Sequence, residues 1–329
     1  MIPEIEKRFN DDVLLEVLSR YGVKKEDIKD LGGFESHVYE FARNGKEYIL
    51  KITHSIRRTE NYIMGEVDFV NYLADNGVPV ARVVPSVNNK LVEIVSENDD
   101  HYFLSYAFEK VYGEDPEGRI TDEVVSNIGK AVAKMHALSM KYELPDSSFI
   151  RERWNETDLF TNYAEYLPPG SELLEQRIGE TLEMIGQYPE ATDSFGLIHG
   201  DVHHGNFFVR EDDIVLFDFD DLETHYFVSD PAVSLYYQLP RDVEKRKEYA
   251  DFFLKNFIKG YRTHNDFKKE WLEAMPDFLK LRDVLLAVVI YQAFDFSKIN
   301  DETRERYLKR IENINNRVPV VDMDFTKYY

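Results

Sequence analysis

The chain has 329 residues, more than a single hydrophobic core usually organises, so two lobes or domains are expected. Hydrophobic residues make up 43% of the sequence and cysteine is absent, which excludes wholesale disorder, disulfides and thiolate metal sites. The net charge of −22 repels nucleic acid and anionic membranes, so neither is an expected partner, and it favours cationic small molecules. No apolar run approaches the roughly 18 residues of a membrane span and the start does not resemble a signal peptide, so a cytoplasmic location is expected.

The N-terminal third of the sequence predicts a lobe of strands and one helix. Asn44-Gly45, the commonest signal for a two-residue hairpin turn, lies between two β-rich runs. Apolar residues at helical spacing follow over 57–76, and this pattern ends at Asn76-Gly77, just before Pro79. The expected strands are 36–42, 47–53, 91–95 and 102–108.

Helical patterns dominate from Thr121 onward. The clearest is an apolar stripe along 121–140, which places His136 in the core. Gly113, in an acidic stretch between the two halves, marks the expected hinge. The other expected helices are 171–187, 242–263, 267–293 and 300–315, with short strands at 207–209 and 214–217. The sequence thus predicts an α+β chain with a small N-terminal lobe over 1–108, a hinge near 107–113, and a large helical lobe over 109–329.

The most informative segment is LIHGDVHHGNFFVREDDIVLFDFDD, residues 197–221. His199-x-Asp201 followed by Asn206 has the spacing of a kinase catalytic loop, and Asp218 ends a short apolar strand twelve residues later. Phosphoryl transfer needs a carboxylate that orients the acceptor hydroxyl and takes its proton late, which Asp201 can supply. It also needs oxygen ligands for Mg²⁺, which Asn206 and Asp218 can supply.

HGDVHHGN followed by FDFDD resembles the HGDxHxxN and DxD patterns of the aminoglycoside phosphotransferase and choline kinase superfamily. The fuller string HHGNFF, LFDFDD and HYFVSDPAVSL is similar to the branch that contains type II homoserine kinases and RdoA/SrkA-like kinases. LGGFESHVY, YILKI and IGKAVAKMHAL extend the resemblance over nearly the whole chain. It implies a two-lobed protein-kinase-like fold with a small antiparallel sheet in the N-terminal lobe, and an ATP- and Mg²⁺-dependent kinase that transfers phosphate to an alcohol.

The resemblance also implies residue roles. Asp201 would be the catalytic carboxylate, and Asn206 and Asp218 would bind Mg²⁺. Lys51 would contact the α- and β-phosphates of ATP, held by Glu66, which is favoured over Glu60 on the same helix. Residues 31–39 would cover the nucleotide, and adenine would bind the backbone near residues 107–109. The residues expected to contact the nucleotide are Gly33, Ser36, Lys51, Glu66 and Phe108.

Acidic residues continue beyond Asp218, and they could contact a cationic acceptor or form a solvated face. These residues are Asp220, Asp221, Glu223 and Asp230. No activation segment follows Asp218, because Asp230-Pro231 comes only twelve residues later and is expected to begin the next helix. A site without that segment suits a small-molecule kinase better than a regulated protein kinase.

Alternatives to a small-molecule kinase stay open at this point. An RdoA-like Ser/Thr protein kinase shares the same motifs. A metallohydrolase could use His199, His203 and His204, since imidazole with carboxylate suits Zn or Fe. A catalytically inactive ATP-binding module is disfavoured, because the catalytic and metal-binding residue types are all present. Aminoglycoside, macrolide, choline, homoserine and sugar-like alcohols remain possible acceptors, because fold does not specify function.

Overall fold

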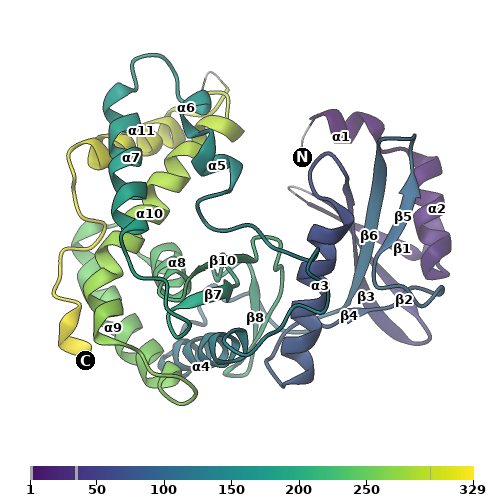
Figure 1. Ribbon diagram of the computed structural model, residues 1–329, viewed down its shortest axis with the longest axis horizontal. Coiled ribbons are helices and arrows are strands. Elements are labelled where there is room, and N and C mark those ends of the chain that lie inside the picture. The colour runs from purple at the N-terminus through teal and green to yellow at the C-terminus, as the bar shows by residue number, and fades with distance from the viewer. Residues whose placement is uncertain (1–2, 34–35, 297) are drawn as a thin grey trace. The chain divides into compact units, whose positions relative to one another are not determined.

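The computed structural model describes residues 3–33, 36–296 and 298–329 (Figure 1). These residues form two compact units. Unit 1 consists of Met1–Glu114, Tyr142–Arg151 and Val215–Asp220. Unit 2 consists of Asp115–Lys141, Glu152–Ile214 and Asp221–Tyr329. The first boundary thus follows Glu114, close to the expected hinge. Residues 142–151 and 215–220, which come after this boundary in the sequence, also belong to unit 1.

Unit 1 is built around a mainly antiparallel sheet with the strand order β1-β2-β3-β6-β4, in which β5 also pairs with β6. Its strands are β1 (Ile28–Gly32), β2 (His37–Arg43), β3 (Lys46–His54), β4 (Val83–Val84), β5 (Glu93–Ser96) and β6 (Tyr102–Glu109). Its helices are α1 (Pro3–Arg8), α2 (Asp11–Tyr21), the 3₁₀ turn η1 (Lys25–Asp27) and α3 (Glu60–Asp75). The predicted hairpin between β2 and β3 is confirmed: Asn44 and Gly45 have φ of 55° and 75°, the left-handed pair that a type I′ turn requires.

The alternation of side chains along β3 positions the first candidate site residue. Leu50 and Ile52 are fully buried in a core that α2 closes with Leu14, Val17 and Leu18. Lys51, between them, therefore points to the opposite face of the sheet. Figure 1 shows α2 on one side of the sheet and α3 on the other. The lysine thus belongs to the face that α3 covers.

The segment 142–151 lies against α3 within unit 1. A Cβ on Gly65 would come within 2.5 Å of the backbone oxygen of Phe149, so only glycine allows this approach. Tyr142 donates a hydrogen bond to Asp68, also on α3, at 2.5 Å. These contacts bring Arg151, at the end of the segment, to the same part of unit 1.

Unit 2 is mainly helical. Its helices are α4 (Asp122–Ser139), α5 (Asp158–Thr161), α6 (Tyr163–Tyr166), α7 (Glu172–Gly186), α8 (Ser229–Gln238), α9 (Val243–Tyr261), α10 (Lys269–Ala293), α11 (Asp301–Asn315) and the 3₁₀ turn η2 (Thr326–Tyr328). Two small antiparallel pairs accompany them, β7 (Phe195–Ile198) with β10 (Glu223–Tyr226), and β8 (Phe207–Arg210) with β9 (Asp213–Leu216), which runs on into unit 1.

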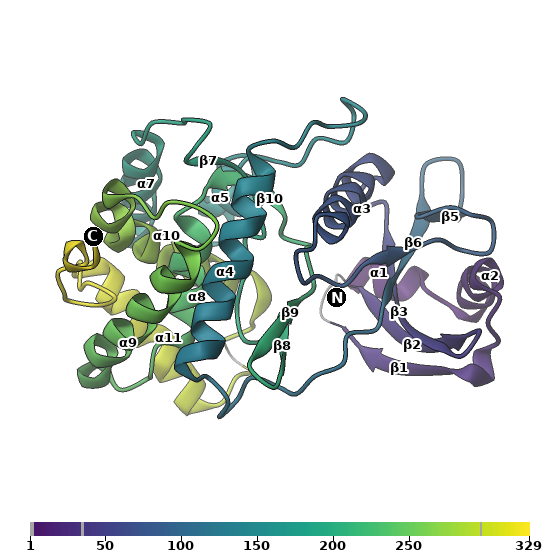
Figure 2. The same cartoon turned by 90° about the horizontal axis from the view of Figure 1, so that it is seen from below.

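Helices α4 and α9 pack closely through two glycines (Figure 2). A Cβ on Gly129 would lie 2.1 Å from the backbone oxygen of Phe257, and one on Gly260 would lie 1.8 Å from that of Ser126. Any larger residue at either position would separate the helix backbones. Of the two helices, α4 also contacts β7, the strand that leads into the catalytic loop.

The expected long elements are confirmed, with bounds that differ by at most three residues at either end. The elements without an expected counterpart are α1, α2, η1, β1, β4, α5, α6, β7, β10 and η2. The helix that begins at Ser229 confirms the expected helix at Asp230-Pro231. None of the helices in the part of the chain that the structure describes combines the length and apolar character needed to cross a bilayer.

Candidate active site

In unit 1, Lys51 contacts the carboxylate at the end of the FDFDD strand. Its Nζ lies 2.9 Å from Asp218 Oδ1 and 3.8 Å from Asp220 Oδ1. Burial alone lowers the pKa of Lys51, but its negative neighbours outweigh burial and raise the pKa well above the ordinary lysine value. Lys51 is therefore a fixed positive charge.

Asp218 has a left-handed backbone with φ of 63°, which is uncommon for a residue with a Cβ. Residues held in such conformations gather at functional sites. Its side chain is 47% exposed, in contrast to the buried Phe219 that follows it. The strained turn thus presents a half-exposed carboxylate directly after a buried strand, as a metal ligand requires.

Asp220, expected to face the acceptor, is instead buried and paired inside unit 1. Arg57 donates to both of its carboxylate oxygens, with Nη1 at 3.1 Å from Oδ1. Arg151 donates to its backbone oxygen at 2.6 Å and stacks on Tyr62, 3.6 Å from the ring centre. Burial raises the pKa of Asp220, but Lys51 and Arg57 reverse this and hold it well below the usual value. This carboxylate secures the segment after β9 that carries Asp218.

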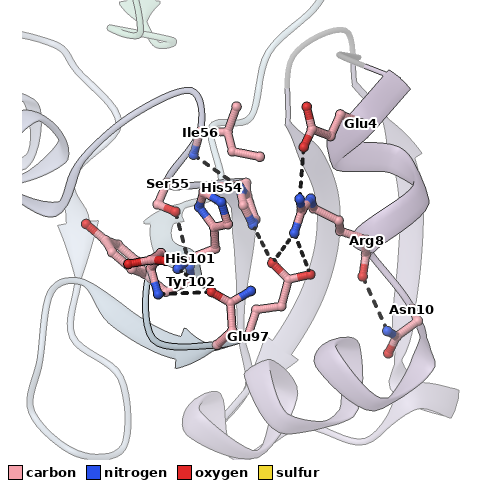
Figure 3. A network of polar contacts seen from close by, with 11 residues as sticks. Glu4, Arg8, Asn10, His54, Ser55, Ile56, Glu97, His101 and Tyr102 are labelled. Atoms are coloured by element: carbon pink, nitrogen blue, oxygen red, sulfur yellow. Dashed lines mark hydrogen bonds and ion pairs between the residues drawn. The ribbon is translucent and has the colours of Figure 1, made fainter.

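A polar network fixes the turn that carries Arg57. Figure 3 shows Glu97 between Arg8 and His54. Both oxygens of Glu97 accept from Arg8, at 3.0 and 2.9 Å, and His54 Nε2 lies 3.2 Å from one of them. His54 Nδ1 accepts from the backbone N–H of Ile56, which leaves its proton on Nε2 as the donor to Glu97. The turn from β3 to α3 is thereby tied to α1.

Glu66 lies on the expected helix face but does not hold Lys51. It is fully buried on α3, whereas Glu60 is exposed. Neither of its carboxylate oxygens has a hydrogen-bond partner among the described residues, and no ion pair joins it to Lys51. Burial raises its pKa to about 7, because Lys51 offsets that burial only in part. Glu66 therefore attracts Lys51 by its charge without a direct ion pair, while the direct contacts of Lys51 are with Asp218 and Asp220.

The loop expected to cover the nucleotide lies partly outside the described residues, since Phe34 and Glu35 are not among them. A Cβ on Gly33 would come within 2.0 Å of the backbone oxygen of Ser36, so glycine is required at this position. Ser36 is buried, 4% exposed. Their contact with a nucleotide stays a prediction.

The backbone expected to bind adenine is largely occupied by neighbouring strands. Ala107 and Phe108 pair with β3 on one side and β4 on the other. The N–H of Glu109 donates to Arg82 at 2.8 Å, and that of Lys110 to Glu47 at 3.1 Å. The N–H groups of Glu109 and Lys110 are therefore already engaged, and adenine binding near residues 107–109 stays a prediction.

In unit 2, the catalytic loop connects β7 to β8 and holds the carboxylate of Asp201 from several sides. Asn206 Nδ2 donates to the backbone oxygen of Asp201 at 3.0 Å and to Oδ2 at 3.1 Å. His203 Nε2 lies 3.0 Å from Oδ2, and His203 Nδ1 accepts from the N–H of Gly205 at 2.8 Å. Asp201 and Asn206 are thus brought together as the spacing predicted.

Arg282, on α10, completes the surroundings of Asp201, and sequence reasoning missed it. Its Nη2 donates to Asp201 Oδ1 and to the hydroxyl of Tyr237. Burial raises the pKa of Asp201, but Arg282 and then His203 outweigh burial and lower it to about 2. Asp201 is therefore ionised at neutral pH. No local pattern marks Arg282, because 81 residues separate it from Asp201.

Asp230, expected to face the acceptor, is a structural residue. It is 0% exposed, and its carboxylate accepts from the N–H groups of His199 and Gly200 at 3.3 and 3.0 Å. His136 Nε2 lies 3.0 Å from the same carboxylate, which confirms that this histidine belongs to the core. Asp230 thus anchors the start of the catalytic loop, and this corrects the expectation of a substrate contact.

Of the four expected acceptor-facing acids, Asp221 and Glu223 remain in accessible positions. Asp221 is exposed and Glu223 is half-buried at the start of β10. Both belong to unit 2, and the charge of Asp221 contributes to raising the pKa of Arg282. Asp221 is therefore an acid of the original cluster whose charge acts on Arg282, the partner of Asp201.

The histidines do not form the ligand set of a metallohydrolase. Both ring nitrogens of His203 already contact Asp201 and Gly205. His199 is buried, and its Nδ1 accepts from the N–H of Asp201 at 3.3 Å. Within the described residues, no group of three or more His, Asp or Glu is arranged to hold a metal ion. These histidines shape the loop.

The proposed Mg²⁺ ligands have suitable donor atoms. Asn206 uses its Nδ2 toward Asp201, which leaves its amide oxygen as the end that can meet a cation. Asp218 provides a half-exposed carboxylate whose Oδ1 is beside Lys51. Mg²⁺ prefers carboxylate and amide oxygens and keeps several waters, so a small set of protein oxygens suffices. Each of the two side chains, taken by itself, therefore offers an oxygen that fits this ion.

Comparison with known proteins decides the family. The sequence profile of the phosphotransferase enzyme family matches residues 27–271. The chain belongs to this family. It is also 34% identical to the amicoumacin kinase of Bacillus subtilis (strain 168), over 98% of this chain and 97% of that protein. The superfamily resemblance seen in the HGDVHHGN and FDFDD motifs is thus confirmed, and this chain is a small-molecule phosphotransferase.

Solved structures agree. A structure of an amicoumacin kinase in complex with AMP-PNP, Ca²⁺ and Ami has a TM-score of 0.94, 31% identity and full coverage of both chains. A microcompartment-associated aminopropanol kinase has a TM-score of 0.74 at 19% identity, covering 93% of this phosphotransferase and 95% of that chain, which shows the fold alone. The predicted kinase-like α+β fold is confirmed, and an ATP-dependent kinase is the activity that this fold and family carry.

Proposed function

We propose that this chain transfers the γ-phosphoryl group of ATP to a hydroxyl of amicoumacin or of a closely related antibiotic. The observation that carries the chemistry is Asp201, an ionised carboxylate held by Arg282, His203 and Asn206. The acceptor follows from the full-length similarity to amicoumacin kinases. A short connection from Asp218 to α8 leaves no room for a protein-kinase activation segment, which favours a small acceptor.

Asp201 orients the acceptor hydroxyl and receives its proton. The hydroxyl oxygen attacks the γ-phosphorus, the bond from that phosphorus to the β,γ-bridging oxygen breaks, and ADP leaves with the bonding electron pair. Because the transition state is loose, the proton moves late, and a carboxylate with a pKa of about 2 is basic enough to accept it from an already phosphorylated oxygen. Asp201 therefore contributes mainly by holding the acceptor hydroxyl in position for attack.

The nucleotide and its metal would be held by the residues described above. Lys51 would pair with the α- and β-phosphates as a permanent positive charge. Asp218 and Asn206 would provide oxygen ligands to Mg²⁺, which when bound neutralises phosphate charge. Asp221 is the exposed acid that would meet a cationic part of the acceptor.

A direct transfer assay tests this proposal. Purified protein is incubated with Mg·ATP and amicoumacin, and the product is analysed by mass spectrometry and ³¹P NMR. We expect stoichiometric formation of ADP and of a phosphate monoester of amicoumacin. Aminopropanol and choline serve as comparison acceptors. If amicoumacin is not modified while either of these is, the proposed acceptor is wrong although the kinase chemistry stands.

A further inference from the structure

The two carboxylate oxygens of Asp201 are bonded unequally. His203 and Asn206, both from the catalytic loop, lie at hydrogen-bond distance from Oδ2. Among the described residues, Oδ1 accepts from Arg282 and from no other side chain. A carboxylate oxygen accepts about two hydrogen bonds, so Oδ2 is saturated and Oδ1 keeps one position. The acceptor hydroxyl can therefore bind only to Oδ1, beside the Arg282 guanidinium.

Arg282 is itself held in one orientation. It extends from α10, and its side chain is 11% exposed. Its Nη2 donates to the Tyr237 hydroxyl at 2.6 Å, and its guanidinium carbon lies 4.8 Å from the centre of the Tyr237 ring. The Tyr237 ring also lies 4.7 Å from that of His203, the other partner of Asp201. Tyr237 thus connects the two side chains that contact opposite oxygens of Asp201.

We propose that Arg282, supported by Tyr237, is a positioning residue that turns the Asp201 carboxylate so that the remaining position on Oδ1 faces the acceptor hydroxyl. This inference rests on the proposed function, in which Asp201 receives the hydroxyl proton. The loop donors restrain only Oδ2, so without Arg282 the carboxylate can rotate about its Cβ–Cγ bond. A rotation of this kind misplaces the reacting group, and misplacement by about 1 Å can cost about 10²-fold in rate.

The same helix provides a matched control. Asp283, the next residue on α10, accepts from the hydroxyl of Tyr236, and Arg310 Nε lies 3.5 Å from its Oδ1. The Arg310 guanidinium carbon lies 5.7 Å from the centre of the Tyr236 ring. This arginine–tyrosine–aspartate set has the same residue types and lacks Asp201. Replacing Arg310, which lies on α11, reports the structural cost of removing an arginine from such a set.

The experiment compares wild type with Arg282→Gln, Arg282→Lys and Arg310→Gln. Steady-state kcat and the KM for ATP are measured with amicoumacin as acceptor and, without it, for ATP hydrolysis to water. We expect Arg282→Gln to lower kcat at least about tenfold with the KM for ATP nearly unchanged. Arg282→Lys should recover part of kcat, because lysine restores one charged donor without the planar fork. Arg310→Gln should keep wild-type kcat.

A wild-type kcat in folded Arg282→Gln, or an equal loss in Arg310→Gln, would overturn the proposal. Should Arg282→Gln not fold, Tyr237→Phe decides, since it removes one partner of Arg282 and should lower kcat about two- to fivefold; an unchanged kcat then overturns the proposal. Should wild type hydrolyse ATP without modifying amicoumacin, the acceptor in the proposed function fails, and the hydrolysis rates still test Arg282. Absence of both reactions in wild type overturns both.

Discussion

Lys51 Nζ lies 2.9 Å from Asp218 Oδ1, although 167 residues separate the two in the chain. Both belong to unit 1, because residues 215–220 return to it after the catalytic loop. Leu216 joins that unit by accepting from the N–H of Ala81 and donating to the oxygen of Pro79. The lysine proposed to contact the phosphates and the carboxylate proposed to bind the metal are therefore fixed relative to each other by one small core.

Replacing Asp218 should remove Mg²⁺-dependent nucleotide binding. Asp218→Asn keeps the side-chain shape and tolerates the left-handed backbone, so it removes mainly the charge. A neutral amide is a poor ligand for a hard dication, and we expect Mg·ATP affinity to fall at least about tenfold. Calorimetry with and without Mg²⁺ measures this, with the exposed Asp213→Asn as control. Equal affinity in both variants would place the metal elsewhere.

Replacing Asp201 should separate catalysis from binding. We expect Asp201→Asn to bind ATP almost as wild type does and to reduce turnover at least about 10²-fold, the scale of lost general-base assistance. His204→Ala, on an exposed side chain of the same loop, should retain wild-type turnover. Steady-state kinetics together with nucleotide titration provide both quantities. Activity that depends on His204 but survives in Asp201→Asn would revive the metallohydrolase interpretation.

Truncation of Asp230 should lower stability far more than truncation of Asp221. Asp230→Ala leaves buried N–H groups of His199 and Gly200 without a partner, so the free energy of unfolding should fall by about 3 kcal/mol. Asp221→Ala removes an exposed carboxylate and should change it by at most about 0.5 kcal/mol. Denaturant unfolding of the two variants provides the comparison. A small effect in Asp230→Ala would return this residue to the list of acceptor contacts.

Glu66 should make stability depend on pH. The unfolded chain releases the Glu66 proton above a pKa of 4.5, whereas the folded chain keeps it up to about 7. Folding therefore takes up a proton in this window, and the free energy of unfolding falls as pH rises from about 4.5 to about 7. Glutamine does not titrate, so the stability of Glu66→Gln should not fall in this way. Its free energy of unfolding relative to that of wild type should rise by on the order of 2–3 kcal/mol between pH 5 and pH 8. A constant difference between the two proteins across this range would show that Glu66 is ionised throughout.

The elements with strong local signals could be read from the sequence. The Asn44-Gly45 turn, the stripe along α4 and the catalytic-loop spacing each depend on neighbours within a few residues, where backbone sterics and side-chain period act directly. α2, whose apolar face closes the core of unit 1, and the two-residue strand β4 had no expected counterpart. β4 exists only by pairing with β6, so no local pattern marks it.

Within the candidate site, the sequence by itself singled out Asp201, Asn206 and Asp218 by their spacing along one segment, and Lys51 by its place on a strand after a glycine-containing loop. The roles of these residues stay predictions. Only the tertiary structure decided the partners of these residues. Arg282 on α10 contacts Asp201. Arg57, which is 163 residues away from Asp220 in the sequence, donates hydrogen bonds to that carboxylate. The tertiary structure also distinguished two aspartates that had the same expected role, since Asp230 is buried against backbone N–H groups while Asp221 stays exposed. Burial and long-range ion pairing depend on how distant segments pack, and no local pattern carries that information.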